Sequence, residues 1–282
     1  MLWLALWLLV SAVGVAGVVA SVNGLRFSRR VARETRELWD GTAEARAIDR
    51  MRIEGLPAPV RAYLAKAFGD RRTAVATVRF RHGGRFRTKL DGPWQPIRGE
   101  QYEAADPPGF LWWGRLRAAP GVWIDARDRC VNGIGGMLVS LESSVTLADR
   151  SGPEMDQGSL LRLLSDIVLF PTAFLDDRYV TWASVNESAA RATLRLNGRE
   201  VAGVFEFGDD CLPRGFFADR YFDTGVGRAE LRPWSGDYAD YREVEGLLVP
   251  HHFLGYWHVD GKRIPYVDFL LERPEYDART PF

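Results

Sequence analysis

The sequence predicts a mainly β (α+β) protein: an N-terminal transmembrane helix followed by a large curved antiparallel sheet, or open half-barrel, covered by a few helices. Three observations support this prediction. Residues 2–25 carry no charged side chain. About a dozen later segments alternate apolar and polar residues, which is the period of a strand. Few segments after residue 55 show the apolar spacing of a helix.

The composition excludes several classes of protein. The 282 residues include 37 Lys and Arg against 37 Asp and Glu, so the formal net charge is zero. Binding to nucleic acid requires a basic face, and no nucleic-acid partner is expected. Two cysteines and four histidines are too few for a disulfide framework or a cysteine-rich zinc site. We therefore expect no metal, no cofactor, and free thiols at Cys130 and Cys211.

The first segment, residues 1–25, is predicted to be a membrane anchor. A helix over Leu2–Leu25 would be about 36 Å long, enough for a hydrocarbon layer of about 30 Å. A signal peptide cleaved before Ser21 is the alternative. A signal peptide, however, begins with a positively charged segment, and no Lys or Arg precedes the apolar run here. The membrane is thus the expected partner of residues 2–25.

The residues that follow the anchor predict its orientation. Arg26, Arg29, Arg30 and Arg33 lie directly after the apolar run. The positive-inside rule then places a single-pass protein in the cell membrane with its soluble domain in the cytoplasm. An export route would place that domain on the extracytoplasmic side, and this alternative stays open. Residues 26–55 are charged and rich in alanine, which predicts a helical stalk.

The β-rich domain is predicted to span residues 56–275, and it begins with a short helix. Val60, Tyr63, Leu64 and Phe68 share one helix face. Proline at position 59 suits a first helical turn, and glycine at 69 suits a helix end. The apolar face of this helix is expected to cover the sheet.

Beyond Thr73 the period of the sequence changes to two. Val78–His82 and Phe86–Leu90 are predicted to pair as a hairpin that turns at Gly83-Gly84. Turn signals such as Asn197-Gly198 and Asp260-Gly261 separate many of the later strands. These strands are predicted over Ile97–Ala104, Phe110–Arg117, Val122–Val131, Met137–Leu147, Val180–Val185, Ala190–Leu196, Glu200–Phe207, Gly215–Asp223, Ala229–Tyr241, Leu248–Val259 and Arg263–Leu271.

A second helix is predicted within the strands, over Ser159–Phe170. Its apolar face consists of Leu160, Leu163, Leu164, Ile167 and Val168, and Pro171 ends it. Residues 276–282 are expected to form a tail.

An aromatic cluster is the first candidate binding feature. Phe110, Trp112 and Trp113 follow Asp106-Pro107-Pro108-Gly109, in which the two prolines exclude a helix. The aromatic rings could line an apolar ligand cavity. They could equally form an ordinary corner of the sheet.

The second candidate feature is a pair of charges on the internal helix. Arg162 and Asp166 are four residues apart, so they can form an ion pair beside the apolar face. A partly buried pair could bind the polar end of a ligand, whereas an exposed pair would be a surface feature only. Phe170 and Trp257 complete the predicted cavity residues.

No motif of a known enzyme class is present. The sequence contains no Gly-x-Ser-x-Gly elbow, Walker loop, dinucleotide fingerprint or His-Glu-x-x-His helix. His251 and His252 are adjacent in a predicted strand and point to opposite faces, so they cannot bind one metal together. We expect no catalysis and name no catalytic residue.

Several motifs together resemble an uncharacterised bacterial family of membrane-anchored proteins over Leu56–Leu271. They are Leu56-Pro57-Ala58-Pro59-Val60, Gly92-Pro93-Trp94, Glu100-Gln101-Tyr102, Asp106-Pro107-Pro108-Gly109-Phe110-Leu111-Trp112, Asp156-Gln157-Gly158-Ser159-Leu160-Leu161-Arg162, Phe170-Pro171-Thr172-Ala173, Tyr238-Ala239-Asp240-Tyr241-Arg242 and Gly246-Leu247-Leu248-Val249-Pro250. The last two motifs together form a Tyr241-Arg242, Gly246, Val249-Pro250 hairpin that also resembles the final strands of lipoprotein carriers of the LolA/LolB type. This resemblance implies an open half-barrel closed by helices over an apolar cavity, and a lipid or acyl-chain ligand.

The predicted function is therefore that of a membrane-tethered binding protein. It would hold a lipid or another apolar ligand in the concavity of the sheet, without catalysis. The alternative is a membrane-anchored interaction or structural module that has no small-molecule ligand. A continuous apolar cavity of roughly 300 Å³ or more distinguishes the two.

Overall fold

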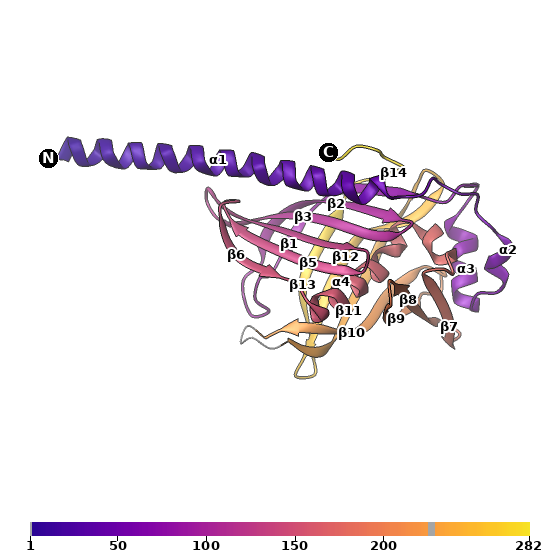
Figure 1. Cartoon of the computed structure of the whole chain (residues 1–282). Coiled ribbons are helices and arrows are strands. Elements are labelled where there is room, and N and C mark those ends of the chain that lie inside the picture. The colour runs from indigo at the N-terminus through magenta and orange to yellow at the C-terminus, as the bar shows by residue number, and fades with distance from the viewer. Residues whose placement is uncertain (1, 225–228) are drawn as a thin grey trace.

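The computed structural model describes residues 2–224 and 229–282 (Figure 1). Within the first helix, the side chains of residues 2, 4–6, 8–10, 12, 13, 15 and 16 lie outside the description. The described helices are α1 (Leu2–Asp40), α2 (Met51–Glu54), α3 (Ala58–Ala67), α4 (Pro153–Asp166) and the short 3-10 helices η1 (Ile167–Leu169) and η2 (Pro171–Leu175).

All the described strands belong to one antiparallel sheet. Its strand order is β6-β5-β4-β3-β2-β1-β13-β12-β11-β10-β9-β8-β7, and β14 pairs with β1. The edges β6 and β7 are not paired with each other, so the prediction of a large, open antiparallel sheet is confirmed. The strands are β1 (Thr77–Phe86), β2 (Gln95–Ala105), β3 (Pro108–Ala119), β4 (Val122–Val131), β5 (Ile134–Leu141), β6 (Val145–Arg150), β7 (Val180–Asn186), β8 (Ala189–Leu196), β9 (Arg199–Phe207), β10 (Pro213–Asp223), β11 (Ala229–Val244), β12 (Leu247–Val259), β13 (Lys262–Leu271) and β14 (Glu275–Tyr276).

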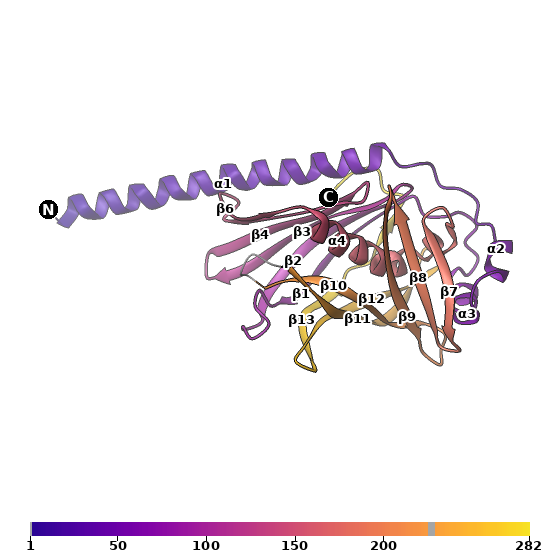
Figure 2. The same ribbon diagram turned by 60° about the horizontal axis from the view of Figure 1, so that its bottom comes forward.

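The sheet curves around α4, which lies in its hollow (Figure 2). This helix contacts β4 and β5 from one half of the sheet and β8, β9 and β10 from the other. Proline occupies its first turn, where the acidic Glu154 and Asp156 also lie, as the helix dipole favours. The helix therefore begins earlier than the predicted Ser159, and the predicted last turn is the 3-10 helix η1.

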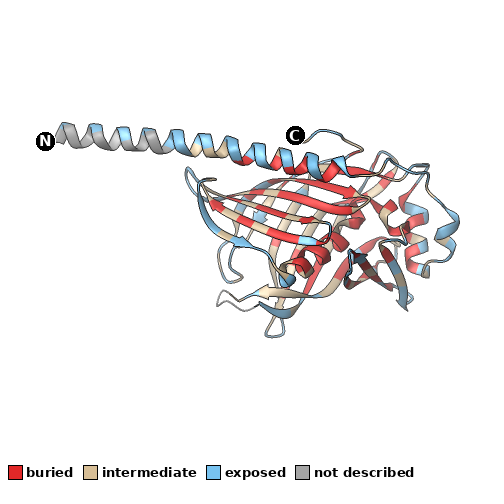
Figure 3. Cartoon of the chain, in the orientation of Figure 1, coloured by how far each residue is buried: buried red, intermediate tan, exposed pale blue. Residues whose placement is uncertain are grey.

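The inner core fills the space between the concave face of the sheet and the helices α3, α4, η1 and η2. As predicted, Val60, Tyr63 and Leu64 of α3 are buried. Figure 3 shows that the buried residues follow α4 and the strands around it. The largest fully buried side chains of this core are Tyr63, Phe68, Phe110, Phe170, Phe174, Phe205 and Phe216.

A second, smaller core lies on the outer face of the sheet, beneath the last turns of α1. Phe27, Val31, Leu38 and Trp39 recur on one helix face and are buried there. The Trp39 indole donates a hydrogen bond of 2.9 Å to the Glu103 carbonyl on β2. Much of the segment predicted as a charged stalk therefore packs against the sheet, and α1 runs past residue 25 without a break.

The structure does not support the predicted membrane anchor over residues 1–25. In the described part of the chain, no helix combines the length and the apolarity that a membrane crossing requires. Residue 1 and many side chains of the segment lie outside the described residues.

The predicted turn at Gly83-Gly84 is wrong, because β1 continues through both glycines. Gly84 has a φ of 129°, and a Cβ atom there would lie 2.1 Å from the Asp268 carbonyl oxygen of β13. The glycine thus permits a close approach of two strands. The prediction of a single strand over Met137–Leu147 is also wrong. The segment forms parts of two strands, β5 and β6, because the chain turns at Glu142 and Ser143, which have positive φ angles.

Candidate functional site: an apolar cavity beneath helix α4

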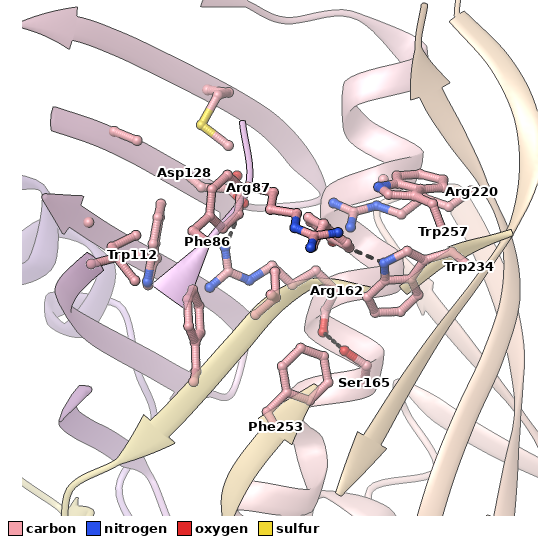
Figure 4. A pocket seen from close by; sticks show the side chains of 18 of the residues that line it. Phe86, Arg87, Trp112, Asp128, Arg162, Ser165, Arg220, Trp234, Phe253 and Trp257 are labelled. Carbon is pink, nitrogen blue, oxygen red and sulfur yellow. Dashed lines mark hydrogen bonds and ion pairs between the residues drawn. The ribbon is translucent and has the colours of Figure 1, made fainter. Parts of the chain in front are cut away.

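The concave face of the sheet and α4 enclose a cavity of about 910 Å³ (Figure 4). Thr88, Lys89 and Asp91 line one end of it and are exposed, so the cavity opens to solvent beside the loop after β1. Most of its wall is aromatic or aliphatic. The apolar lining includes Phe80, Phe86, Trp112, Leu116, Met137, Val168, Trp234, Phe253, Trp257 and Phe269.

Four of the seven predicted cavity residues line this space: Trp112, Arg162, Asp166 and Trp257. Phe110 and Phe170 are instead fully buried in the inner core. The ring of Phe110 still supports the site, because the Arg162 guanidinium lies 4.7 Å from its centroid.

Trp113 does not belong to the cavity, contrary to the prediction. Neighbouring residues of a strand point to opposite faces, so Trp112 points inward and Trp113 outward. On the outer face, the Trp113 indole donates a hydrogen bond of 3.2 Å to Asp125 and packs beside the core under α1.

Arg162 is the centre of a polar cluster in the cavity wall. Its guanidinium donates hydrogen bonds of 2.7 Å to Asp128 on β4 and 2.7 Å to Gln101 on β2. The predicted ion pair with Asp166 is present at 3.5 Å, and both side chains are less than one-fifth exposed. The alternative of an exposed surface pair is therefore wrong. Figure 4 shows Arg162 reaching Asp128 from α4.

Gln101 connects this cluster to a buried carboxyl group at Glu103. The Gln101 amide nitrogen donates to Asp166 at 2.8 Å and also to Glu103. Glu103 is fully buried, and its Oε2 has no hydrogen-bond partner among the described residues. Burial raises the pKa of Glu103 well above its ordinary value, and the charge of Asp166 raises it further. Glu103 is consequently neutral when ordinary carboxyl groups are ionised.

Glu103→Gln is expected to stabilise the protein at neutral pH. The folded state holds a proton on Glu103 that the unfolded chain releases at the ordinary glutamate pKa. Stability therefore falls as pH rises from that value toward the raised pKa, by at most about 1.4 kcal/mol per pH unit. Glutamine removes this fall, so the stability difference between variant and wild type in urea denaturation should widen as the pH rises above the ordinary glutamate pKa. If the difference in unfolding free energy between Glu103→Gln and wild type does not change with pH, Glu103 is not neutral in the folded protein.

His82 positions Trp112 in the cavity wall. The Trp112 indole donates a hydrogen bond of 2.8 Å to Nε2 of His82, and the imidazole stacks on Phe269 with 4.1 Å between ring centroids. Burial lowers the pKa of His82 to about 3, so the ring is neutral at physiological pH. His82 is thus an uncharged part of an aromatic wall.

Sequence reasoning missed Gln101, Glu103 and Asp128, which complete the polar cluster. A signal existed for the first two: they alternate along β2 with Tyr102 and Ala104, as residues of one strand face do. Two further cavity residues, Arg87 and Arg220, were also missed. Within residues 2–224 and 229–282, no group of three His, Cys, Asp or Glu side chains is arranged to hold a metal ion.

An open antiparallel sheet, a helix in its hollow and an apolar cavity between them define a class of cavity-bearing β proteins. Within that class, the chain belongs to DUF6544, a family of unknown function, whose model matches residues 46–269.

Two crystal structures are similar to this chain. One is a DUF1329 family protein from Desulfovibrio piger, with a TM-score of 0.43 and 15% identity over 82% of this chain and 94% of that chain. The other is a LolA superfamily protein from Nitrosomonas europaea, with a TM-score of 0.36 and 9% identity over 77% of this chain and 92% of that chain. At these TM-scores neither similarity carries an argument about function. No curated protein matches the sequence.

Proposed function

We propose that this protein binds an apolar or amphiphilic molecule, such as a lipid, in the cavity between the sheet and α4. The observation that carries this proposal is the cavity itself, whose volume of about 910 Å³ lies in the range of small-molecule sites. The proposal does not depend on a membrane tether.

The chemistry of the wall favours hydrocarbon. Trp234, Phe253 and Trp257 line the cavity together with Trp112 and Phe269. Transfer of apolar surface from water onto such a wall stabilises a complex by about 25 cal/mol per Å². The polar groups are few and localised, which is the arrangement that fixes the orientation of a largely apolar ligand.

An interaction module without a ligand has no need of such a cavity. Its binding surface would be a sheet edge or an exposed face. The inward-facing aromatic residues of β3, β11 and β12 therefore favour the ligand-binding function over this alternative.

Ala126→Trp is expected to weaken ligand binding at least about tenfold. Ala126 lines the cavity from β4, between Gly114 of β3 and Val139 of β5. An indole at this position would occupy space that the ligand needs. The measurement is a fluorescence titration with the uncharged probe N-phenyl-1-naphthylamine, and Val139→Trp is a second variant should Ala126→Trp fail to fold.

The matched control is Ala183→Trp, because Ala183 is exposed on the edge strand β7. This control should bind the probe as wild type does. Unchanged probe affinity in a folded Ala126→Trp or Val139→Trp protein would contradict binding in this cavity.

A further inference from the structure

We propose that the ligand is an anionic amphiphile whose carboxylate or phosphate group binds Arg220, with Arg87 as a second contact. This inference rests on the proposed function and specifies the chemical class of its ligand. Its basis is the contrast between these two arginines and Arg162, since the three guanidinium groups reach the same cavity but only one of them has carboxylate partners (Figure 4).

Arg220 lies near the end of β10 and is partly buried. Its guanidinium carbon lies 5.1 Å from the ring centroid of Trp234 and 5.9 Å from that of Trp257. Within the described residues it forms no hydrogen bond and no ion pair. Glycine at position 158 lets α4 approach this side chain, because a Cβ atom there would lie 3.2 Å from the Arg220 Nε. Arg220 is thus a cation held between aromatic rings without a counter-charge.

Arg87 lies directly after β1, a strand of the same sheet that is separated from β10 by β13, β12 and β11. Its guanidinium makes two long hydrogen bonds of 3.4 Å, to the carbonyl oxygens of Leu90 and Pro265, and lies 4.5 Å from the ring centroid of Trp94. Its Nε is buried and has no hydrogen-bond partner in the described part of the chain. No described carboxylate forms an ion pair with it. Arg87 therefore also has unused donors.

Arg162 differs because its charge is already balanced. It pairs with Asp128 and Asp166, and it also donates to Gln101. An additional anion at this position would compete with two carboxylates. The predicted role of Arg162 in binding the polar end of a ligand is therefore better fulfilled by Arg220.

The acidic groups at the rim do not replace the missing counter-charge. Asp91, Glu154 and Asp223 line the cavity but are exposed, and Asp223 pairs with Arg150 at 3.6 Å. Removing a guanidinium from water without a partner is unfavourable, whereas a bidentate carboxylate or phosphate completes its hydrogen bonds. When the anionic head of the ligand binds Arg220, its hydrocarbon chain can pack against the aromatic wall of the cavity.

The test compares hexadecanoate, hexadecyl phosphate and the uncharged hexadecanol, each displacing N-phenyl-1-naphthylamine from the full chain at pH 8. Arg220→Gln is expected to weaken both anions about tenfold or more, as the loss of a charged hydrogen bond does, and hexadecanol less than about twofold. Arg87→Gln should also lower the affinity for both anions, but by a smaller factor. Arg195→Gln is the control, because Arg195 forms an exposed ion pair with Glu200 on β8 and β9.

The outcomes separate this inference from the proposed function. A larger loss for hexadecyl phosphate than for hexadecanoate identifies a phosphate head, and the reverse identifies a carboxylate. The inference is overturned if Arg220→Gln and Arg87→Gln bind the anions with wild-type affinity. It is also overturned if their affinity for hexadecanol falls by the same factor as their affinity for the anions. If the wild-type protein binds none of the three probes, the proposed function itself fails.

Discussion

Replacing Arg162 by methionine is expected to lower the free energy of unfolding by about 3–5 kcal/mol. The side chains of Asp128 and Asp166 are 2% and 15% exposed, and both largely buried carboxylates would lose their cation. Methionine keeps the packing volume over Phe110 and Trp112, so the loss reports on charge and hydrogen bonding. Urea denaturation at pH 7.5 measures the effect.

Arg195→Met is the matched control for this experiment. Both members of its ion pair with Glu200 are 56% exposed, and exposed pairs contribute about 0–1 kcal/mol. A similar small loss in Arg162→Met would mean that water reaches the polar cluster freely, and its role as a buried network would be wrong.

Leu164→Ala is expected to lower the free energy of unfolding by about 2–5 kcal/mol. Leu164 is fully buried on α4, the helix that contacts both halves of the sheet. Truncation leaves a void that the strands on two sides cannot both close. Guanidinium denaturation of Leu164→Ala measures the loss.

Leu270→Ala is the control for the core substitution, because Leu270 of β13 is 56% exposed. Its loss should stay within about 0.5 kcal/mol, as for most surface changes. Equal effects of the two leucines would contradict the placement of α4 inside the sheet.

Much of the β architecture could be predicted because its signals are local. Alternation of period two marks a strand wherever one face is buried, and signals such as Asn197-Gly198 mark the turns. The helix α3 was equally clear, since its apolar face and its flanking proline and glycine lie within a few residues. These patterns depend on nearest neighbours in the chain.

The errors concern contacts between segments far apart in the sequence. Gly83-Gly84 has the composition of a turn, but the approach of β13 explains its glycines. Residues 112 and 113 are both tryptophan, and only the position of the sheet relative to α1 and α4 decides which of them faces the cavity. Likewise, the outer core under α1 requires the helix and β3 to meet.

The candidate site was predictable only in part for the same reason. Arg162 and Asp166 are neighbours on one helix, so their pairing follows from spacing. Gln101 and Asp128 reach them from two different strands. Arg220 becomes notable only in the folded chain, where Trp234 and Trp257 lie beside its guanidinium and no described carboxylate forms an ion pair with it. Unpaired charge is a property of the folded chain.

Native mass spectrometry of the detergent-purified full chain tests the central claim most directly. The ligand-binding account predicts that wild type and Ala183→Trp carry a copurified amphiphile of the same mass, and that Ala126→Trp lacks it. The same bound mass on all three proteins at equal occupancy, or no bound amphiphile on any of them, would contradict the account.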